Sequence, residues 1–141
     1  MSEIPEQPNI KLAESMEYPA RVLLIDDYES ITRALKRFFK DDGDFETATC
    51  HDVDEALAAV KRMKPQIILL DHSLTRDADA GFKIARQVWQ MDPNTQIIST
   101  TSRWLDVYEQ YQKLANEMKA THPVTHVEKH DHRQISAIIN S

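Results

Sequence analysis

The stretch that decides the fold is residues 22–27, which reads VLLIDD. Four branched apolar residues in a row predict a strand that is buried on both faces, as in a parallel sheet. Asp26 and Asp27 follow at once and end the apolar run. A second run, QIILL at residues 66–70, ends in the same way at Asp71. Two buried strands that each stop at an acid predict a polar site at the ends of these strands.

Around these strands, apolar residues recur every three or four positions, which predicts helices. Asp52 and Glu55 have the spacing of a capping box, so a helix should begin there, and Pro65 should close it. The expected helices cover residues 31–38, 52–63, 81–91, 104–118 and 135–139, and the expected strands cover residues 22–25, 45–50, 66–70, 96–100 and 123–128.

Five strands that are each followed by a helix predict right-handed crossovers and a parallel sheet with helices on both faces. The expected fold class is therefore α/β, a three-layer αβα sandwich with a five-stranded parallel sheet and five helices. Residues 1–20 carry three prolines and scattered acids without an apolar period, so we expect a flexible tail there. Residues 21–141 are expected to form one domain.

Composition excludes several classes of function. The chain has 141 residues and a net charge of −6, so it offers no basic surface for nucleic acid. No apolar run is long enough to cross a membrane and no secretory signal opens the chain, so a cytoplasmic location is predicted. One cysteine excludes an internal disulfide, and two glycines cannot build a phosphate-binding loop. Proteins are therefore the expected partners.

In parallel sheets, ligands bind beyond the carboxyl ends of the strands. The residues at these ends are Asp26, Asp27, Asp71, a hydroxyl cluster at 100–102, and Lys129. Each alone has a simpler explanation as a helix cap, a turn residue or a solvated charge. Together, three carboxylates at one edge would repel each other unless one takes up a proton or a cation intervenes. Mg²⁺ prefers such oxygen ligands, and with the Lys129 ammonium it would balance the three negative charges.

From Arg21 to about Ile139 the sequence resembles the receiver domain of bacterial response regulators, the family of the chemotaxis receiver. The resemblance implies a flavodoxin-like fold with strand order 2-1-3-4-5 and a switch that accepts a phosphoryl group, not an enzyme in the usual sense. The matching stretches, in order, are residues 22–27, residues 65–71, Gly81, residues 92–102 and residues 127–129.

The resemblance also implies the role of each residue in the acidic site. Asp71 takes the place of the phosphoacceptor. Asp27 would bind Mg²⁺ directly and Asp26 through water, while Asp71 and the backbone carbonyl of Ser73 would supply further ligands.

Two further residues complete the site that the resemblance implies. Thr101 takes the place of the switch hydroxyl that turns toward a phosphoryl oxygen, although a slip of one residue would give this place to Thr100. Lys129 matches the lysine that pairs with the acceptor carboxylate and then with the phosphoryl group.

The sequence departs from the family pattern at several places. Two additional residues separate Asp71 from Gly81, and Ser102 stands where a small residue usually follows the switch hydroxyl. His126 occupies the place of an aromatic residue whose rotation often accompanies switching. A zinc site is a weak alternative, because the histidines concerned do not have structural-zinc spacing. These histidines are His122, His126, His130 and His132.

Three functions compete for this sequence. The first is a phosphorelay switch that receives its phosphoryl group from a sensor histidine kinase or a phosphotransfer protein. Its downstream protein would bind the face formed by helix 104–118, strand 123–128 and helix 135–139, and the chain would be a monomer or a weak dimer. The second is a receiver-like adaptor that works without phosphorylation. The third, an aspartate-nucleophile phosphatase, is disfavoured because residues 71–73 lack its Asp-x-Asp pattern.

Overall fold

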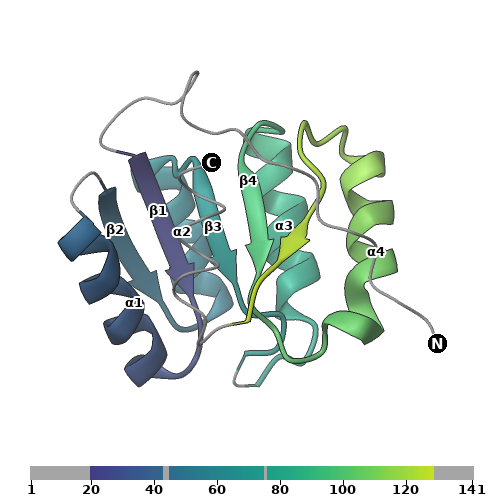
Figure 1. Cartoon of the computed structure of the whole chain (residues 1–141). Coiled ribbons are helices and arrows are strands. Elements are labelled where there is room, and N and C mark those ends of the chain that lie inside the picture. The colour runs from purple at the N-terminus through teal and green to yellow at the C-terminus, as the bar shows by residue number, and fades with distance from the viewer. Residues whose placement is uncertain (1–19, 43–44, 75, 129–141) are drawn as a thin grey trace.

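Figure 1 shows the computed structural model of the chain, which describes residues 20–42, 45–74 and 76–128. Strands and helices alternate throughout this part of the chain. They are β1 (Ala20–Ile25), α1 (Glu29–Asp42), β2 (Phe45–Cys50), α2 (Val53–Met63), β3 (Ile67–Leu70), α3 (Ala80–Met91), β4 (Gln96–Ser99), α4 (Trp104–Glu117) and β5 (Thr125–His126).

The strands form one parallel sheet in the order β2-β1-β3-β4-β5. This confirms the expected sheet and its strand order. β1 and β3 are neighbours, and Ile25 is paired with Leu70 at their carboxyl ends. The structure describes four helices, and the fifth expected helix, at residues 135–139, lies outside the described residues. Within the described part, no helix is long and apolar enough to span a bilayer.

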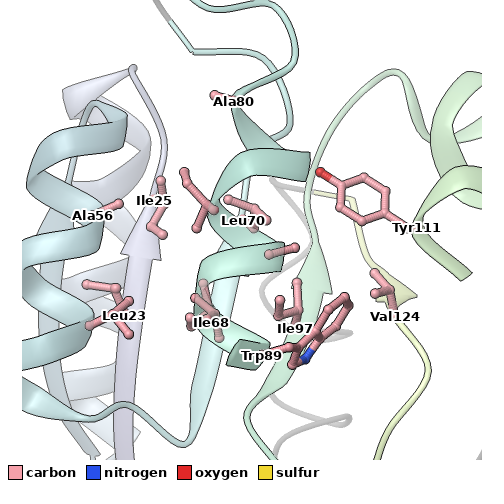
Figure 2. Close-up of a cluster of buried hydrophobic side chains, with 14 of the residues drawn as sticks. Leu23, Ile25, Ala56, Ile68, Leu70, Ala80, Trp89, Ile97, Tyr111 and Val124 are labelled. Atoms are coloured by element: carbon pink, nitrogen blue, oxygen red, sulfur yellow. The ribbon is translucent and has the colours of Figure 1, made fainter. Parts of the chain in front are cut away.

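Alternate residues of the central strands face opposite layers of the protein, which follows from the period of two in a strand. Leu23 and Ile25 belong to a large core with α2, α3 and α4, whereas Val22 and Leu24 belong to a second core with α1. Figure 2 shows the large core, in which Trp89 of α3 packs against the sheet. Because both faces of β1 and β3 are covered, their runs of purely apolar residues are explained.

Local sequence signals set the ends of α2. The Asp52 side chain accepts a hydrogen bond from the Glu55 amide at 2.8 Å, as the capping spacing predicts. At the other end, Lys64 adopts a left-handed conformation with φ of 49° directly before Pro65. The predicted start and stop of this helix are therefore confirmed.

Four of the five strands differ in extent from the expected ones, and β3 differs only in beginning at Ile67 instead of residue 66. β1 begins at Ala20, one residue before the expected domain boundary, and Ala20 is buried. β4 ends at Ser99 instead of residue 100, and β5 covers only two of the six expected residues. Before the start of β5, Gln112 of α4 binds the backbone of Val124, with its amide group 2.8 Å from the Val124 carbonyl oxygen. Pro123 has no amide hydrogen to donate to the sheet.

Candidate functional site

Three carboxylates meet at the carboxyl edge of the sheet. Asp26 and Asp27 follow β1, and Asp71 follows the neighbouring strand β3. One oxygen from each side chain can be chosen so that all three lie within 4.8 Å of one another. Asp26 and Asp71 are buried, with 3% and 6% of their surfaces exposed, and Asp27 is half-buried. The structure thus brings together the three acids that the sequence predicts as metal ligands.

The backbone of this edge is fixed because the hydrogen-bond ladder continues one residue beyond each strand. The amide of Asp26 donates to the Cys50 carbonyl at 3.1 Å, and the amide of Asp71 donates to the Ile25 carbonyl at 2.9 Å. Thr100 continues the ladder on β4, since its amide donates to the Leu70 carbonyl at 3.0 Å. The acids therefore sit at defined positions on adjacent parallel strands.

The donor set of this cluster fits a small divalent cation. Carboxylate oxygens are the ligands that Mg²⁺ prefers, at about 2.1 Å, so two oxygens bound to one ion lie at most about 4.2 Å apart. The observed limit of 4.8 Å allows two acids to bind directly and the third through a water molecule. Three carboxylates at this distance repel each other, and a cation between them would remove that repulsion.

Thr101, the expected switch hydroxyl, lies in the loop between β4 and α4 and is 2% exposed. Its hydroxyl oxygen accepts a hydrogen bond from the Arg103 amide at 3.1 Å, and its own amide donates to the Ser99 hydroxyl at 3.3 Å. Thr100 is also buried, at 4% exposure. The assignment of the switch hydroxyl to Thr101, with Thr100 as the alternative, stays a prediction.

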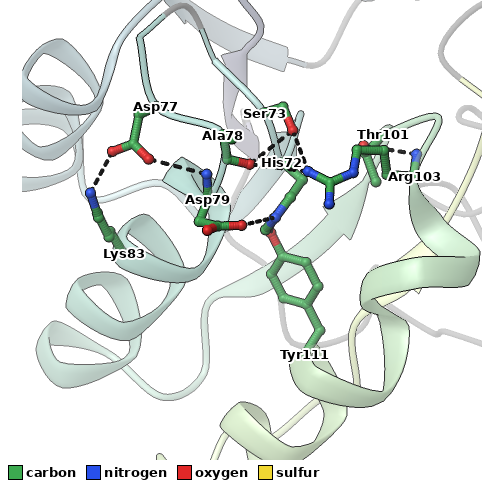
Figure 3. Close-up of polar contacts among 9 residues, drawn as sticks. All are labelled: His72, Ser73, Asp77, Ala78, Asp79, Lys83, Thr101, Arg103 and Tyr111. Carbon is green, nitrogen blue, oxygen red and sulfur yellow. Dashed lines mark hydrogen bonds and ion pairs between the residues drawn. The ribbon is translucent and has the colours of Figure 1, made fainter.

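Ser73 lies in the loop after Asp71, and a residue that sequence reasoning missed contacts it. The Ser73 hydroxyl donates to the Ala78 carbonyl at 2.9 Å and accepts from the Arg103 guanidinium at 3.1 Å. Figure 3 shows how Arg103 reaches from the start of α4 to this loop. In the sequence, only the position of Arg103 two residues after Thr101 indicates that Arg103 lies near the site.

The same loop contains a buried histidine that sequence reasoning also passed over. His72 directly follows Asp71 and is 0% exposed. Its Nδ1 atom lies 2.7 Å from the Tyr111 hydroxyl, and its Nε2 atom lies 3.3 Å from an Asp79 oxygen. Burial lowers the pKa of His72, with the Asp79 hydrogen bond opposing this shift. A histidine without charge is therefore enclosed beside the acidic cluster.

His126, on β5, is buried, and its correspondence to the family's aromatic residue stays a prediction. Its ring is stacked on Trp104 with ring centres 5.2 Å apart and an angle of 7° between the planes. Its Nδ1 atom lies 3.3 Å from the Ser99 hydroxyl. Burial lowers the pKa of His126, while the nearby Glu128 carboxylate opposes the shift. Lys129, the expected cation of the site, lies outside the described residues.

The fold and the acidic edge define a class, the doubly wound α/β proteins with a cluster of carboxylates at the ends of their parallel strands. The family model of the response regulator receiver domain matches residues 22–135. The chain therefore belongs to the response regulator receiver domain family of two-component signalling. Receiver domains are signalling switches, and they typically bind Mg²⁺ in an acidic pocket.

Individual relatives agree with this family. The transcriptional regulatory protein TrcR from Mycobacterium tuberculosis is 34% identical over 85 residues, which is 60% of this chain but only 32% of TrcR. A response regulator from Burkholderia pseudomallei, solved with a phosphorylated aspartic acid, a calcium ion and citrate, has a TM-score of 0.66 at 21% identity, over 85% of this chain and 66% of that one.

A further solved structure covers nearly the whole of both chains. The CheX-CheY complex with BeF₃ and Mg²⁺ from Borrelia burgdorferi has a TM-score of 0.67 at 21% identity, over 93% of this chain and 92% of that chain. At this level of identity, the solved structures show the fold alone.

Proposed function

We propose that Asp71 accepts a phosphoryl group from a phosphohistidine of a sensor histidine kinase or a phosphotransfer protein, in a reaction that depends on Mg²⁺. The observation that carries this proposal is the cluster of Asp26, Asp27 and Asp71, with oxygens within 4.8 Å, at the carboxyl edge of a receiver domain. The relatives that were solved with a phosphorylated aspartic acid, or with BeF₃ and Mg²⁺, support the same chemistry.

Four groups would hold the metal ion: the carboxylates of Asp26, Asp27 and Asp71 and the backbone carbonyl of Ser73. All four offer hard oxygen donors, which is the chemistry that Mg²⁺ requires. When bound, the ion would offset the charge of the carboxylates and of the incoming phosphoryl oxygens.

In the transfer step, one carboxylate oxygen of Asp71 attacks phosphorus. The new O–P bond forms as the N–P bond of the donor breaks, and the imidazole nitrogen of the donor keeps the electron pair. Asp71 is suited to this step because it lies at the carboxyl end of β3, where its backbone amide is bonded to the Ile25 carbonyl.

Thr101 and Lys129 would then bind the transferred group. The Thr101 oxygen already accepts a hydrogen bond from the Arg103 amide, so its own O–H can donate toward a phosphoryl oxygen. The Lys129 ammonium would pair with the phosphoryl charge, as the resemblance to the family implies.

The response would be read by a downstream protein on the face formed by α4, β5 and the expected last helix. Leu105, at the start of α4, supports this proposal because its apolar side chain is 66% exposed. Tyr108 lies one turn further along the helix and is half-buried. The cytoplasmic location and the monomeric or weakly dimeric state stay predictions.

The proposal is tested by incubating the chain with Mg²⁺ and acetyl phosphate and measuring its intact mass. The wild-type chain should gain the mass of one phosphoryl group, and both Asp71→Asn and a chelator should abolish the gain. Asp54→Asn is the matched control, because Asp54 is an exposed acid of α2 that does not belong to the cluster. This control should be phosphorylated like the wild type.

A wild-type chain that gains no phosphoryl group, or an Asp71→Asn variant that still gains one, would contradict the proposal. The first result would favour the adaptor that binds partners without phosphorylation. The presence of all three carboxylates disfavours the adaptor, because an adaptor would gain nothing from three acids that repel each other.

A further inference from the structure

The loop that carries Asp71 is tied to α4 by a buried hydrogen bond. His72 Nδ1 and the Tyr111 hydroxyl lie 2.7 Å apart, although these residues are 39 positions apart in the sequence. Both side chains are almost fully buried, with 0% and 1% of their surfaces exposed. Figure 3 shows Tyr111 reaching from α4 to the His72 ring. The contact therefore joins two elements that flank the proposed site.

The chemistry of the neighbours indicates where the protons lie. The Asp79 carboxylate accepts hydrogen bonds only, so His72 Nε2, at 3.3 Å from it, carries the imidazole proton. His72 Nδ1 must then accept the hydrogen bond that the Tyr111 hydroxyl donates. The Tyr111 hydroxyl and His72 Nδ1 are therefore donor and acceptor in one oriented, buried hydrogen bond.

Gly81 leaves the space in which this bond forms. A Cβ atom at position 81 would lie 1.8 Å from the Tyr111 hydroxyl oxygen and 2.7 Å from His72 Nδ1. In addition, the Gly81 amide donates to the His72 carbonyl at 2.8 Å. The first turn of α3, the loop after β3 and the middle of α4 therefore meet at a single point.

Aromatic packing encloses this point. The Phe82 ring lies edge-on to His72, with ring centres 4.4 Å apart, and 4.7 Å from the centre of Tyr111. In such an enclosed place a lost hydrogen bond is not replaced by water, so the donor and the acceptor hold each other in one arrangement.

We propose that His72 and Tyr111 are a positioning pair, whose hydrogen bond fixes the backbone that carries Asp71 and couples phosphorylation of Asp71 to α4. This inference rests on the proposed function, because the phosphoryl transfer gives the pair its role. His72 stands between Asp71 and Ser73, so a displacement of its ring would disturb the backbone that runs from the acceptor to the proposed carbonyl ligand. Neither His72 nor Tyr111 takes part in the transfer itself.

Three variants and one control test the pair. Tyr111→Phe removes only the hydroxyl, while His72→Asn keeps an acceptor for that hydroxyl and His72→Leu does not. The control is Tyr108→Phe on the same helix, where the Tyr108 ring packs against Trp104 at 5.9 Å. Among the described residues, the Tyr108 hydroxyl makes no hydrogen bond, so its removal should leave the loop unchanged.

The first measurement uses the full chain without a phosphodonor. We expect hydrogen exchange at the Gly81 amide to become at least five times faster in Tyr111→Phe and to stay unchanged in Tyr108→Phe. The Ile68 amide, in the middle of β3, serves as the internal reference in each variant. Equal exchange rates at Gly81 in both tyrosine variants would overturn the proposal, whether or not Asp71 accepts a phosphoryl group.

The second measurement adds Mg²⁺ and acetyl phosphate, with intact mass recorded on the same samples. Phosphorylation should shift the amide resonances of Leu105 and Tyr108 in the wild type, and these shifts should fall to half or less in Tyr111→Phe although the phosphoryl group is attached. His72→Asn should retain more of the shift than His72→Leu.

The outcomes separate the two proposals. Full shifts on α4 in a phosphorylated Tyr111→Phe chain would overturn the coupling. A wild-type chain that is never phosphorylated would overturn the proposed function, and the coupling with it, while faster exchange in Tyr111→Phe would still show that the pair fixes the loop.

Discussion

Two loops at the carboxyl edge of the sheet are held in different ways. The loop before α2 is held by a neighbour in the sequence, since Asp52 accepts the amide of Glu55 three positions later. The loop between β3 and α3 is held by Tyr111 of α4, 39 positions away, and is also contacted by Arg103, the residue before α4, from 30 positions away. The bond that fixes the end of the first loop is thus local, whereas the second loop combines local bonds, such as that of Ser73 to Ala78, with contacts that form only in the completed fold.

The largest loss of stability is expected from replacing Gly81, which packs against the loop between β3 and α3. Gly81→Ala places a methyl group 1.8 Å from the Tyr111 hydroxyl oxygen, and overpacking of this kind costs about 3 kcal/mol. Alanine recovers about 1 kcal/mol through its higher helix propensity. Urea denaturation should therefore show a loss of about 2 kcal/mol.

The Tyr111→Phe background controls this prediction, because it removes the atom that is closest to the new methyl group. Gly81→Ala should cost less there than in the wild type. Equal costs in both backgrounds would mean that the Tyr111 hydroxyl does not limit this position.

The pH dependence of stability tests the burial of His126, a residue of β5 that is enclosed by residues distant in the sequence such as Trp104 and Ser99. Burial lowers the pKa of His126 in the folded chain, so the unfolded chain takes up the proton first as the pH falls below about 6.5. The stabilisation is complete above this pH and is lost below it, by at most about 1.4 kcal/mol per pH unit for one proton.

Urea denaturation at pH 7.5, 6.5 and 5.5 measures this slope. His72 contributes in the same direction, because burial lowers its pKa too. His126→Phe keeps a ring that can stack on Trp104 and cannot titrate, so it should reduce the slope between pH 6.5 and 5.5. An unchanged slope would show that His126 titrates alike in both states.

The next smaller change in stability is expected from a substitution in the loop before α2. Asp52→Ala removes the helix cap and should lower the free energy of unfolding by about 1 kcal/mol. Asp54→Ala makes the same change of charge in the first turn without removing that hydrogen bond, so it should cost less. If both variants lose equal stability in urea denaturation, the helix dipole and not the cap explains the effect.

Arg103 should have the smallest effect on stability. Its guanidinium contacts Ser73 and Ala78 from an exposed position, so Arg103→Gln should change the free energy of unfolding by less than about 0.5 kcal/mol. Arg86→Gln, at another exposed position, is the matched control. A loss as large as that of Asp52→Ala would show that the exposed contact also holds the loop.

Sequence reasoning reached the features that depend on neighbours or on a general rule of the fold. The apolar runs before Asp26 and Asp71 predicted buried strands, and the rule for parallel sheets placed both acids at one edge, while the family resemblance supplied the order that makes the two strands neighbours. The cap at Asp52 followed from its spacing to Glu55.

Features that need three-dimensional proximity were out of reach. Tyr111 fits the apolar stripe of α4 by spacing and is indeed buried, but nothing in the sequence shows that its hydroxyl meets His72. Likewise, nothing in the sequence shows that Gln112 of α4 binds the backbone of Val124, directly before β5. Such pairs become visible only when the elements have been packed.

The backbone hydrogen bonds that continue beyond β1, β3 and β4 limit how the carboxyl edge of the sheet can respond to a bound group. The amides of Asp26, Asp71 and Thr100 are each bonded to the carbonyl of the adjacent strand. Peptide planes at these positions cannot rotate without breaking the sheet itself. Any rearrangement must therefore begin in side-chain rotamers and spread through the helices, while the framework beneath keeps its shape.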